Sequence, residues 1–174
     1  MRRILLSLAG AALLALPAAT SAGAAATGKH GFLVVRKAQG DGGLFGPPVV
    51  TVVVQGFVLG RASQEARVDV FQLPSSGGGG AAQAVGADVS KTTVRWRHFT
   101  GNRYRGSSFR FRAVGGAYRV VIRGSGVYLF AGGQGTVTLH GSSVYRRSDG
   151  TYSIGGRAFR SLPPKKLTLP IGRG

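Results

Sequence analysis

The residues with the clearest chemical potential are arginines that alternate with aromatic residues in RYRGSSFRFR, positions 103–112. Guanidinium groups bind phosphate through two parallel hydrogen bonds, and aromatic rings stack on nucleic-acid bases. A binder of single-stranded nucleic acid needs its rings and its cations on one exposed surface. Whether this segment can do that depends on the secondary structure that carries it.

A two-residue turn at Gly106-Ser107 would separate the rings from the cations. Glycine suits the first central position of a type II′ turn, because it adopts positive φ without strain. In the resulting hairpin Tyr104 lies opposite Phe109, and side chains alternate between the two faces. We therefore expect the rings in a core and the cations outside it, which argues against nucleic-acid binding. The rings are Tyr104, Phe109 and Phe111, and the cations are Arg103, Arg105, Arg110 and Arg112.

Charge is the strongest compositional signal, because the chain has 23 Lys and Arg but only 5 Asp and Glu. Its formal net charge is +18. Such a chain attracts polyanions in a salt-dependent way. We expect an anionic wall polymer or lipid headgroups as partner, with Tyr128 and Phe130 beside the cations as interaction aromatics. A protein partner, or a charged face that serves only solubility, are the alternatives. The predicted anion-binding residues are Arg103, Arg105, Arg110, Arg112, Arg119 and Arg123.

Catalytic constellations are weak in this sequence. The absence of cysteine excludes thiol nucleophiles and cysteine metal sites. His140, Ser142 and Asp149 lie close in sequence, but they flank an expected tight turn and no GxSxG motif accompanies them. Gly77, Gly79 and Ala82 fit a GxGxxA spacing, but four consecutive glycines make that spacing nearly automatic. We expect no catalytic residues, no metal and no cofactor. A small hydrolase or a ligand-carrying barrel is the alternative.

The N-terminus has the pattern of a secretory signal peptide. Arg2 and Arg3 precede an apolar run that Pro17 ends, and small residues follow at a cleavage motif. We expect residues 1–24 to be removed and residues 25–30 to be disordered. The mature chain would then be secreted or extracytoplasmic, within the cell envelope, and without a transmembrane segment.

Residues 31–162 read as a single all-β domain. Residues 31–38, 49–59 and 66–73 have the β-branched or alternating character of strands, and Gly56 predicts a bend inside the second of them. Residues 74–90 are rich in glycine and alanine and predict a flexible loop. The tail 163–174 would be loose or would form an edge strand.

Four related hexapeptides follow in the second half of the chain: YRGSSF, IRGSGV, LHGSSV and IGGRAF. Each is typical of a glycine-led hairpin turn. Successive hairpins predict an antiparallel meander that closes as a barrel or forms a two-sheet sandwich, and a β-solenoid-like stack is the alternative. The predicted turn glycines are Gly106, Gly124, Gly141 and Gly156.

Taken together, these features predict a secreted, noncatalytic β-rich module. It would bind an anionic component of the cell envelope through an arginine-rich sheet face. A structural or protein-interaction β domain is the leading alternative.

Overall fold

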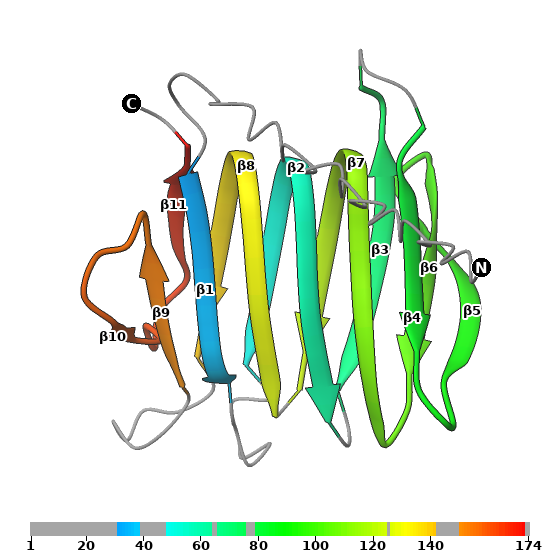
Figure 1. Ribbon diagram of the computed structural model, residues 1–174, viewed down its shortest axis with the longest axis horizontal. Coiled ribbons are helices and arrows are strands. Elements are labelled where there is room, and N and C mark those ends of the chain that lie inside the picture. The colour runs from blue at the N-terminus through cyan, green and yellow to red at the C-terminus, as the bar shows by residue number, and fades with distance from the viewer. Residues whose placement is uncertain are drawn as a thin grey trace, which may run out of the picture.

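A computed structural model of the protein describes residues 31–38, 48–63, 66–75, 79–124, 126–141 and 150–172. These residues form an antiparallel sheet of eleven strands that is not closed into a barrel (Figure 1). The strands are β1 Gly31–Ala38, β2 Val49–Ser63, β3 Arg67–Leu73, β4 Ala81–Val85, β5 Ser90–Trp96, β6 Phe99–Arg105, β7 Ser108–Arg123, β8 Val127–His140, β9 Thr151–Ile154, β10 Arg160–Ser161 and β11 Leu167–Ile171. The predicted all-β antiparallel fold is therefore confirmed.

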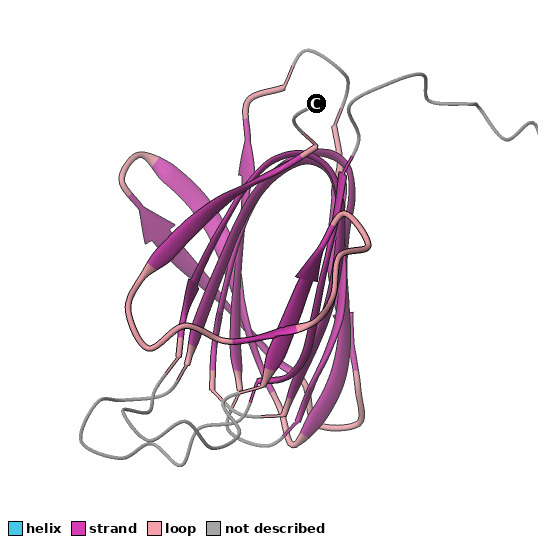
Figure 2. Cartoon of the chain, turned by 90° about the vertical axis from the view of Figure 1, so that its left-hand side faces the viewer, coloured by secondary structure: helices cyan, strands magenta, loops and turns pink. Residues whose placement is uncertain are grey.

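Three long strands, β2, β7 and β8, bend in the middle and fold the sheet into two layers (Figure 2). We call the layer with β1 and β4 the front layer, because it faces the viewer in Figure 1, and the layer with β3, β5, β6 and β11 the back layer. The bends lie at one end of the sandwich, and we call the other end the open end. These three strands therefore contribute to both layers along their own length.

Glycines make the bends possible. Gly56 of β2 pairs with Gly116 of β7 and with Gly133 of β8, so that one row of glycines crosses the three strands. Gly56 and Gly133 have φ of 149° and 132°, which favours glycine. A Cβ atom at either position would collide with the backbone of the neighbouring strand. The predicted bend at Gly56 is confirmed, and the pairing register shifts immediately after it.

The topology is that of one long hairpin coiled on itself. Its tip joins β5 to β6 at Arg97-His98, and Arg97 has a φ of 54°. Strands of this hairpin also pair with strands from the neighbouring turn of the coil. For example, β2 pairs with β8 on one side and with β7 on the other. Moving away from the tip, the paired residues are Ser90 with Arg105, Ala81 with Val114, Arg67 with Arg123, Val49 with His140, and Leu33 with Ile154.

The core fills the space between the two layers. Alternate side chains of β2 point inward, including Val50, Val52 and Val54 from the back layer and Val58 from the front layer, and all are at most 2% exposed. Tyr118 is fully buried, and its hydroxyl group donates to the carbonyl oxygen of Val114 at 2.7 Å. Side chains that point away from this core form two outer faces, one on each layer.

The strand pairing shows that the hairpins predicted at Gly106 and Gly124 are wrong. Tyr104 pairs with Val68 and Lys91 instead of Phe109, and Phe109 pairs with Ala62. At Gly106-Ser107 the chain crosses from the back layer to the front layer. Gly124 lies at a second crossing, between the end of β7 and the start of β8. Its backbone N–H donates a hydrogen bond to the carbonyl oxygen of Pro48. A glycine-led turn favours a hairpin locally, but the long valine-rich strand β2 pairs with both neighbours and separates them.

The remaining turn glycines and segments have different outcomes. Gly141 donates to the carbonyl oxygen of Pro163, and the partner segment predicted for its hairpin lies outside the described residues. The turn at Gly156 spans Ile154 to Arg157, one residue earlier than predicted, with positive φ at Gly155 and Gly156. Within 74–90, predicted as a loop, lies strand β4, and within the tail 163–174 lies β11, which pairs with β8. Residues 1–30 lie outside the described residues.

Candidate functional site

The six predicted anion-binding arginines lie on two opposite faces. Arg110 and Arg112 alternate with the buried Phe109 and Phe111 on the front layer, so their side chains point outward there. β6 and the second half of β7 belong to the back layer, and their arginines lie on its outer face. Tyr128 and Phe130, predicted beside the cations, lie on the front face with Arg110 and Arg112, and not with Arg119 and Arg123. The back-layer arginines are Arg103, Arg105, Arg119 and Arg123.

The predicted separation of rings from cations is confirmed despite this rearrangement. Tyr104, Phe109 and Phe111 are at most 3% exposed, whereas Arg105 and Arg110 are exposed. The separation holds because it depends only on strand alternation, which is the same whichever strand lies alongside.

The back face brings Arg67 into the predicted cluster. Arg67 of β3 pairs with Arg105 on one side and with Arg123 on the other. We call Arg105, Arg67 and Arg123 the arginine row. Neighbouring strands lie about 4.8 Å apart, so the row spans roughly 10 Å. Like charges directly opposite each other cost stability, which makes the row a place where an anion would stabilise the sheet.

One carboxylate lies beside the row. Asp69 is 6% exposed, and Arg103 donates to it in a bidentate pair, with Nε 2.7 Å from Oδ1 and a terminal nitrogen 3.0 Å from Oδ2. This contact raises the pKa of Arg103. The Nε atom of Arg67 lies 3.6 Å from Asp69 Oδ2, too far for a good hydrogen bond. Asp69 therefore neutralises Arg103 better than it neutralises the row.

The electrostatics of Arg67 reflect this imbalance. Burial lowers the pKa of Arg67, and the positive charges of Arg103, Arg123 and Arg105 lower it further, while Asp69 raises it. Its buried Nε–H has no hydrogen-bond partner among the described residues. In the part of the chain that the structure describes, no carboxylate lies within ion-pair distance of Arg105 or Arg123. The row thus places three arginines on neighbouring strands in an unbalanced positive field.

Aromatic rings line the back face beside the row, toward the bends. Trp96 stacks on Phe99 with 5.6 Å between ring centroids, and it also contacts the buried Phe71. The guanidinium group of Arg119 lies 4.2 Å from the centre of the Trp96 ring. Burial, and then the charge of Arg123, lower the pKa of Arg119. Trp96 therefore anchors a cation on an outer face, and it is not a core residue.

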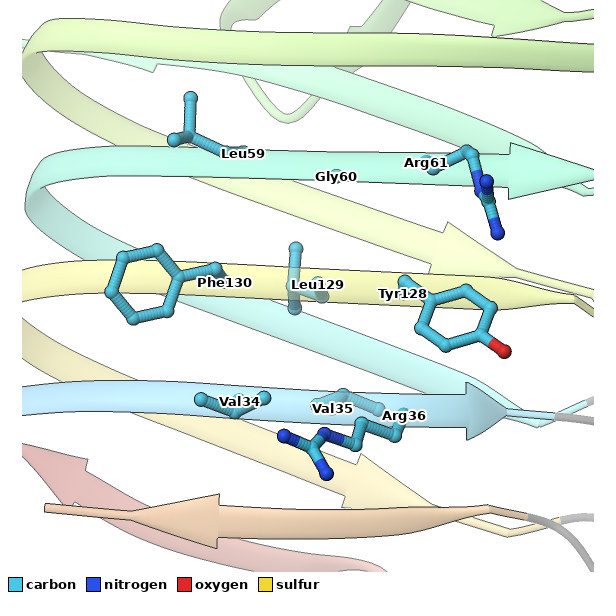
Figure 3. Close-up of a pocket in the computed structure, with 9 residues that line it drawn as sticks. All are labelled: Val34, Val35, Arg36, Leu59, Gly60, Arg61, Tyr128, Leu129 and Phe130. Carbon is cyan, nitrogen blue, oxygen red and sulfur yellow. The ribbon is translucent and has the colours of Figure 1, made fainter. Parts of the chain in front are cut away.

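The front face has a different character, because it carries a groove of about 310 Å³ over β1, β8 and β2 (Figure 3). Two rows of side chains cross it. The row nearer the bends is apolar, with Leu59 and Val34 paired on either side of Phe130. The row nearer the open end is cationic, with Arg61 and Arg36 on either side of Tyr128. We call the residues of these two rows the aromatic groove.

Apolar exposure is concentrated on this front face. Phe32, Leu59, Phe130 and Phe159 are each about two-fifths exposed, and Val85 at the end of β4 is 65% exposed. Phe130 packs against Phe57 and Phe32, with ring centroids 5.4 and 6.2 Å apart. Among the described residues these five are the exposed large hydrophobic side chains, and all belong to the front face or its border.

Sequence reasoning missed much of both surfaces. It recognised β3 as a strand, but it did not place Arg67 or Asp69 in a site, because the strands beside β3 were unknown. Arg36, Arg61 and Leu59 were missed for the same reason. The available signal was alternation with buried neighbours, as at Arg67 and Asp69 on either side of the buried Val68.

The candidate catalytic residues do not form a described site. His140 ends β8 and pairs with Val49, while Ser142 and Asp149 lie outside the described residues. The described residues contain no group of His, Asp or Glu arranged to hold a metal ion.

Comparisons with known proteins leave the assignment to the geometry. No protein-family model, no curated protein and no solved structure matches this chain. In the described part of the chain there is no helix with the length and apolar character to cross a membrane.

Proposed function

We propose that this protein is an exported, noncatalytic β module that binds a phosphate-bearing polymer of the cell envelope through the arginine row on its back face. The observation that carries the proposal is the direct alignment of Arg105, Arg67 and Arg123 across three neighbouring strands, beside one carboxylate already engaged by Arg103. The expectation of export rests on the signal-peptide pattern at the N-terminus.

Phosphate is the anion that best fits this arrangement. Guanidinium groups bind its oxygen atoms bidentately, and the exposed Arg105 and Arg123 have no carboxylate within ion-pair distance among the described residues. A polymer supplies repeated phosphates, which can engage the row and also Arg103 or Arg119 beside it. Because strand pairing holds the backbone of all three arginines, binding has to order only their side chains.

The test uses inorganic polyphosphate as the probe and two variants of equal charge. Arg105→Ser with Arg123→Ser removes two members of the row. Arg110→Ser with Arg112→Ser removes two arginines from the front face and serves as the matched control. We expect the row variant to weaken binding at least tenfold, and to reduce the slope of log affinity against log salt by about 2, because about one counterion is released per phosphate contact.

The control variant should retain affinity within about threefold, since only long-range charge is lost and the Debye length is about 8 Å at physiological salt. An equal loss in the two variants would show that net charge alone drives binding, and would reject the row as the site. The second arm of the test is fractionation of cells that express the full chain. Recovery in the cytoplasm would reject the envelope as its place of action.

A further inference from the structure

The aromatic groove on the front face is a second surface, independent of the arginine row. We propose that it docks on the surface of a bilayer that contains anionic phospholipid, with its apolar row entering the interface and its cationic row contacting headgroup phosphates.

The groove is amphipathic along the direction of the strands. Leu59 and Phe130 are 38% and 41% exposed and lie toward the bends. Two residues further along each of these strands, toward the open end, come Arg61 and Tyr128, which pair with each other. Figure 3 shows Leu59, Val34 and Phe130 at one end of the groove and Arg61 with Tyr128 at the other, and the guanidinium group of Arg36 lies between these ends. A bilayer surface has the same order, from acyl chains to phosphates.

Charge complementarity selects an anionic surface. Arg110 continues the cationic row beyond Arg61, and Arg112 lies beside Leu59. Of the two acids in the described ranges, Asp69 is on the other face and Asp88 accepts a hydrogen bond from the backbone of Ser107 at the open end. Juxtamembrane arginines each contribute about 1 kcal/mol of attraction to an anionic leaflet.

The residues that line the groove favour binding to a membrane interface over binding of a small polar ligand. The groove is lined by apolar side chains, two arginines and one tyrosine, and among the described residues no amide or carboxylate lines it to recognise a sugar. The guanidinium group of Arg61 lies 5.1 Å from the centre of the Tyr128 ring, and that of Arg36 lies 4.2 Å from the Phe159 ring. Rings with a polar end or a cation beside them favour the headgroup region.

A second copy of the chain fits this face poorly. A two-fold contact centred on the groove would bring the same patch together from both molecules. The cationic rows, with Arg36, Arg61 and Arg110, would then meet without acids to balance them among the described residues. An anionic bilayer covers the apolar row and neutralises these arginines in one contact.

The experiment uses tryptophan fluorescence, since the chain has a single tryptophan. Trp96 lies on the back face, so lipids brominated on their acyl chains should not quench it in the wild-type protein. In a variant that combines Trp96→Phe with Leu59→Trp, the reporter moves to the aromatic groove. The probes are vesicles of phosphatidylglycerol mixed with brominated phosphatidylcholine, and vesicles of brominated phosphatidylcholine alone.

We expect at least half of the Leu59→Trp fluorescence to be quenched on the mixed vesicles, and less than a tenth of the wild-type fluorescence. Vesicle partitioning should fall about tenfold or more with Phe130→Ser, and by a similar factor with Arg36→Ser plus Arg61→Ser. Arg105→Ser plus Arg123→Ser removes the same charge from the back face, and should reduce partitioning by less than about threefold. Circular dichroism and urea unfolding check that each variant is folded.

Three results would overturn the proposal. One is quenching of Trp96 but not of the groove reporter. Another is equal partitioning of the Phe130→Ser variant and the wild type, which would mean that charge alone holds the protein at the vesicle. The third is a wild-type dimer in sedimentation that Phe130→Ser dissociates while vesicles are ignored, which would assign the groove to a second copy.

Discussion

The two outer faces of the sandwich use the same residue types in different ways. Both carry arginines, aromatic rings, and a guanidinium group placed over a ring. On the back face the rings are less exposed, because Phe71 is 3% exposed and Arg119 lies over Trp96, which is partly buried together with Phe99. On the front face Phe32 and Phe130 stay about two-fifths exposed. The comparison teaches that arginine and aromatic content alone does not determine a surface; whether the rings are covered does.

The largest expected effect comes from the bends that create both faces. A side chain at Gly133 would strike the carbonyl oxygen of Gln55, and its φ of 132° is unfavourable for other residues. We expect Gly133→Val to destabilise the fold by at least about 3 kcal/mol in urea unfolding, and to abolish binding by both faces.

The control for this variant is Gly79→Ala, where a Cβ atom meets nothing within 4 Å. It should change stability by no more than about 0.5 kcal/mol. A normally stable Gly133→Val protein would contradict the two-layer arrangement itself.

A second prediction compares a ring between the layers with a ring on the front face. Phe111 is 3% exposed and Phe130 is 41% exposed. We expect Phe111→Ala to cost about 3 to 5 kcal/mol in the free energy of unfolding, because it leaves a cavity, and Phe130→Ala to cost about 1 kcal/mol or less. Chemical denaturation measures both. Similar costs would mean that Phe130 serves stability, and would weaken its role in docking.

A third prediction concerns Asp69, the carboxylate that pairs with arginines on the back face. Asp69→Asn leaves Arg103 and Arg67 without their counter-charge, so we expect a loss of about 2 kcal/mol in stability. Polyphosphate should then raise the melting temperature of the variant more than that of the wild type, since it supplies the missing anion. A smaller shift in the variant would imply that Asp69 aligns the site, and that its negative charge does not compete with the ligand.

The smallest expected effect lies in the shared core. Burial raises the pKa of Tyr118, and the fold therefore favours its neutral form. The stability that comes from this preference is fully present below the pKa of tyrosine in the unfolded chain, about 10. It is lost as the pH rises through the higher pKa of Tyr118 in the folded protein. Tyr118→Phe should cost about 1 kcal/mol at neutral pH and should lose less stability than the wild type at high pH. If the wild type and the Tyr118→Phe variant lose equal free energy of unfolding as the pH rises above about 10, the raised pKa of Tyr118 is contradicted.

Local patterns in the sequence predict the strands but not their neighbours. Alternation located β1, β2 and β3 and correctly placed Tyr104, Phe109 and Phe111 in the core. Gly56 correctly marked a bend. These features depend on a few consecutive residues.

The coil could not be predicted in the same way, because pairing in it joins residues far apart in sequence. The turn at Gly106-Ser107 was interpreted as a hairpin, although the chain there only crosses between layers. Arg103 and Arg110 were consequently assigned to one face. The arginine row needs Arg67 and Arg123, which only the pairing of β3 with β7 brings together.

The most direct test of two separate faces uses the absence of cysteine from the chain. An environment-sensitive dye is attached to Leu59→Cys on the front face or to Thr92→Cys, which pairs with Arg103 on the back face. The account predicts that phosphatidylglycerol vesicles shift only the emission of the Leu59 dye, and that polyphosphate shifts only that of the Thr92 dye. If both ligands shift the same dye and leave the other unchanged, the protein has one anion-binding face, and the division of labour between its layers is wrong.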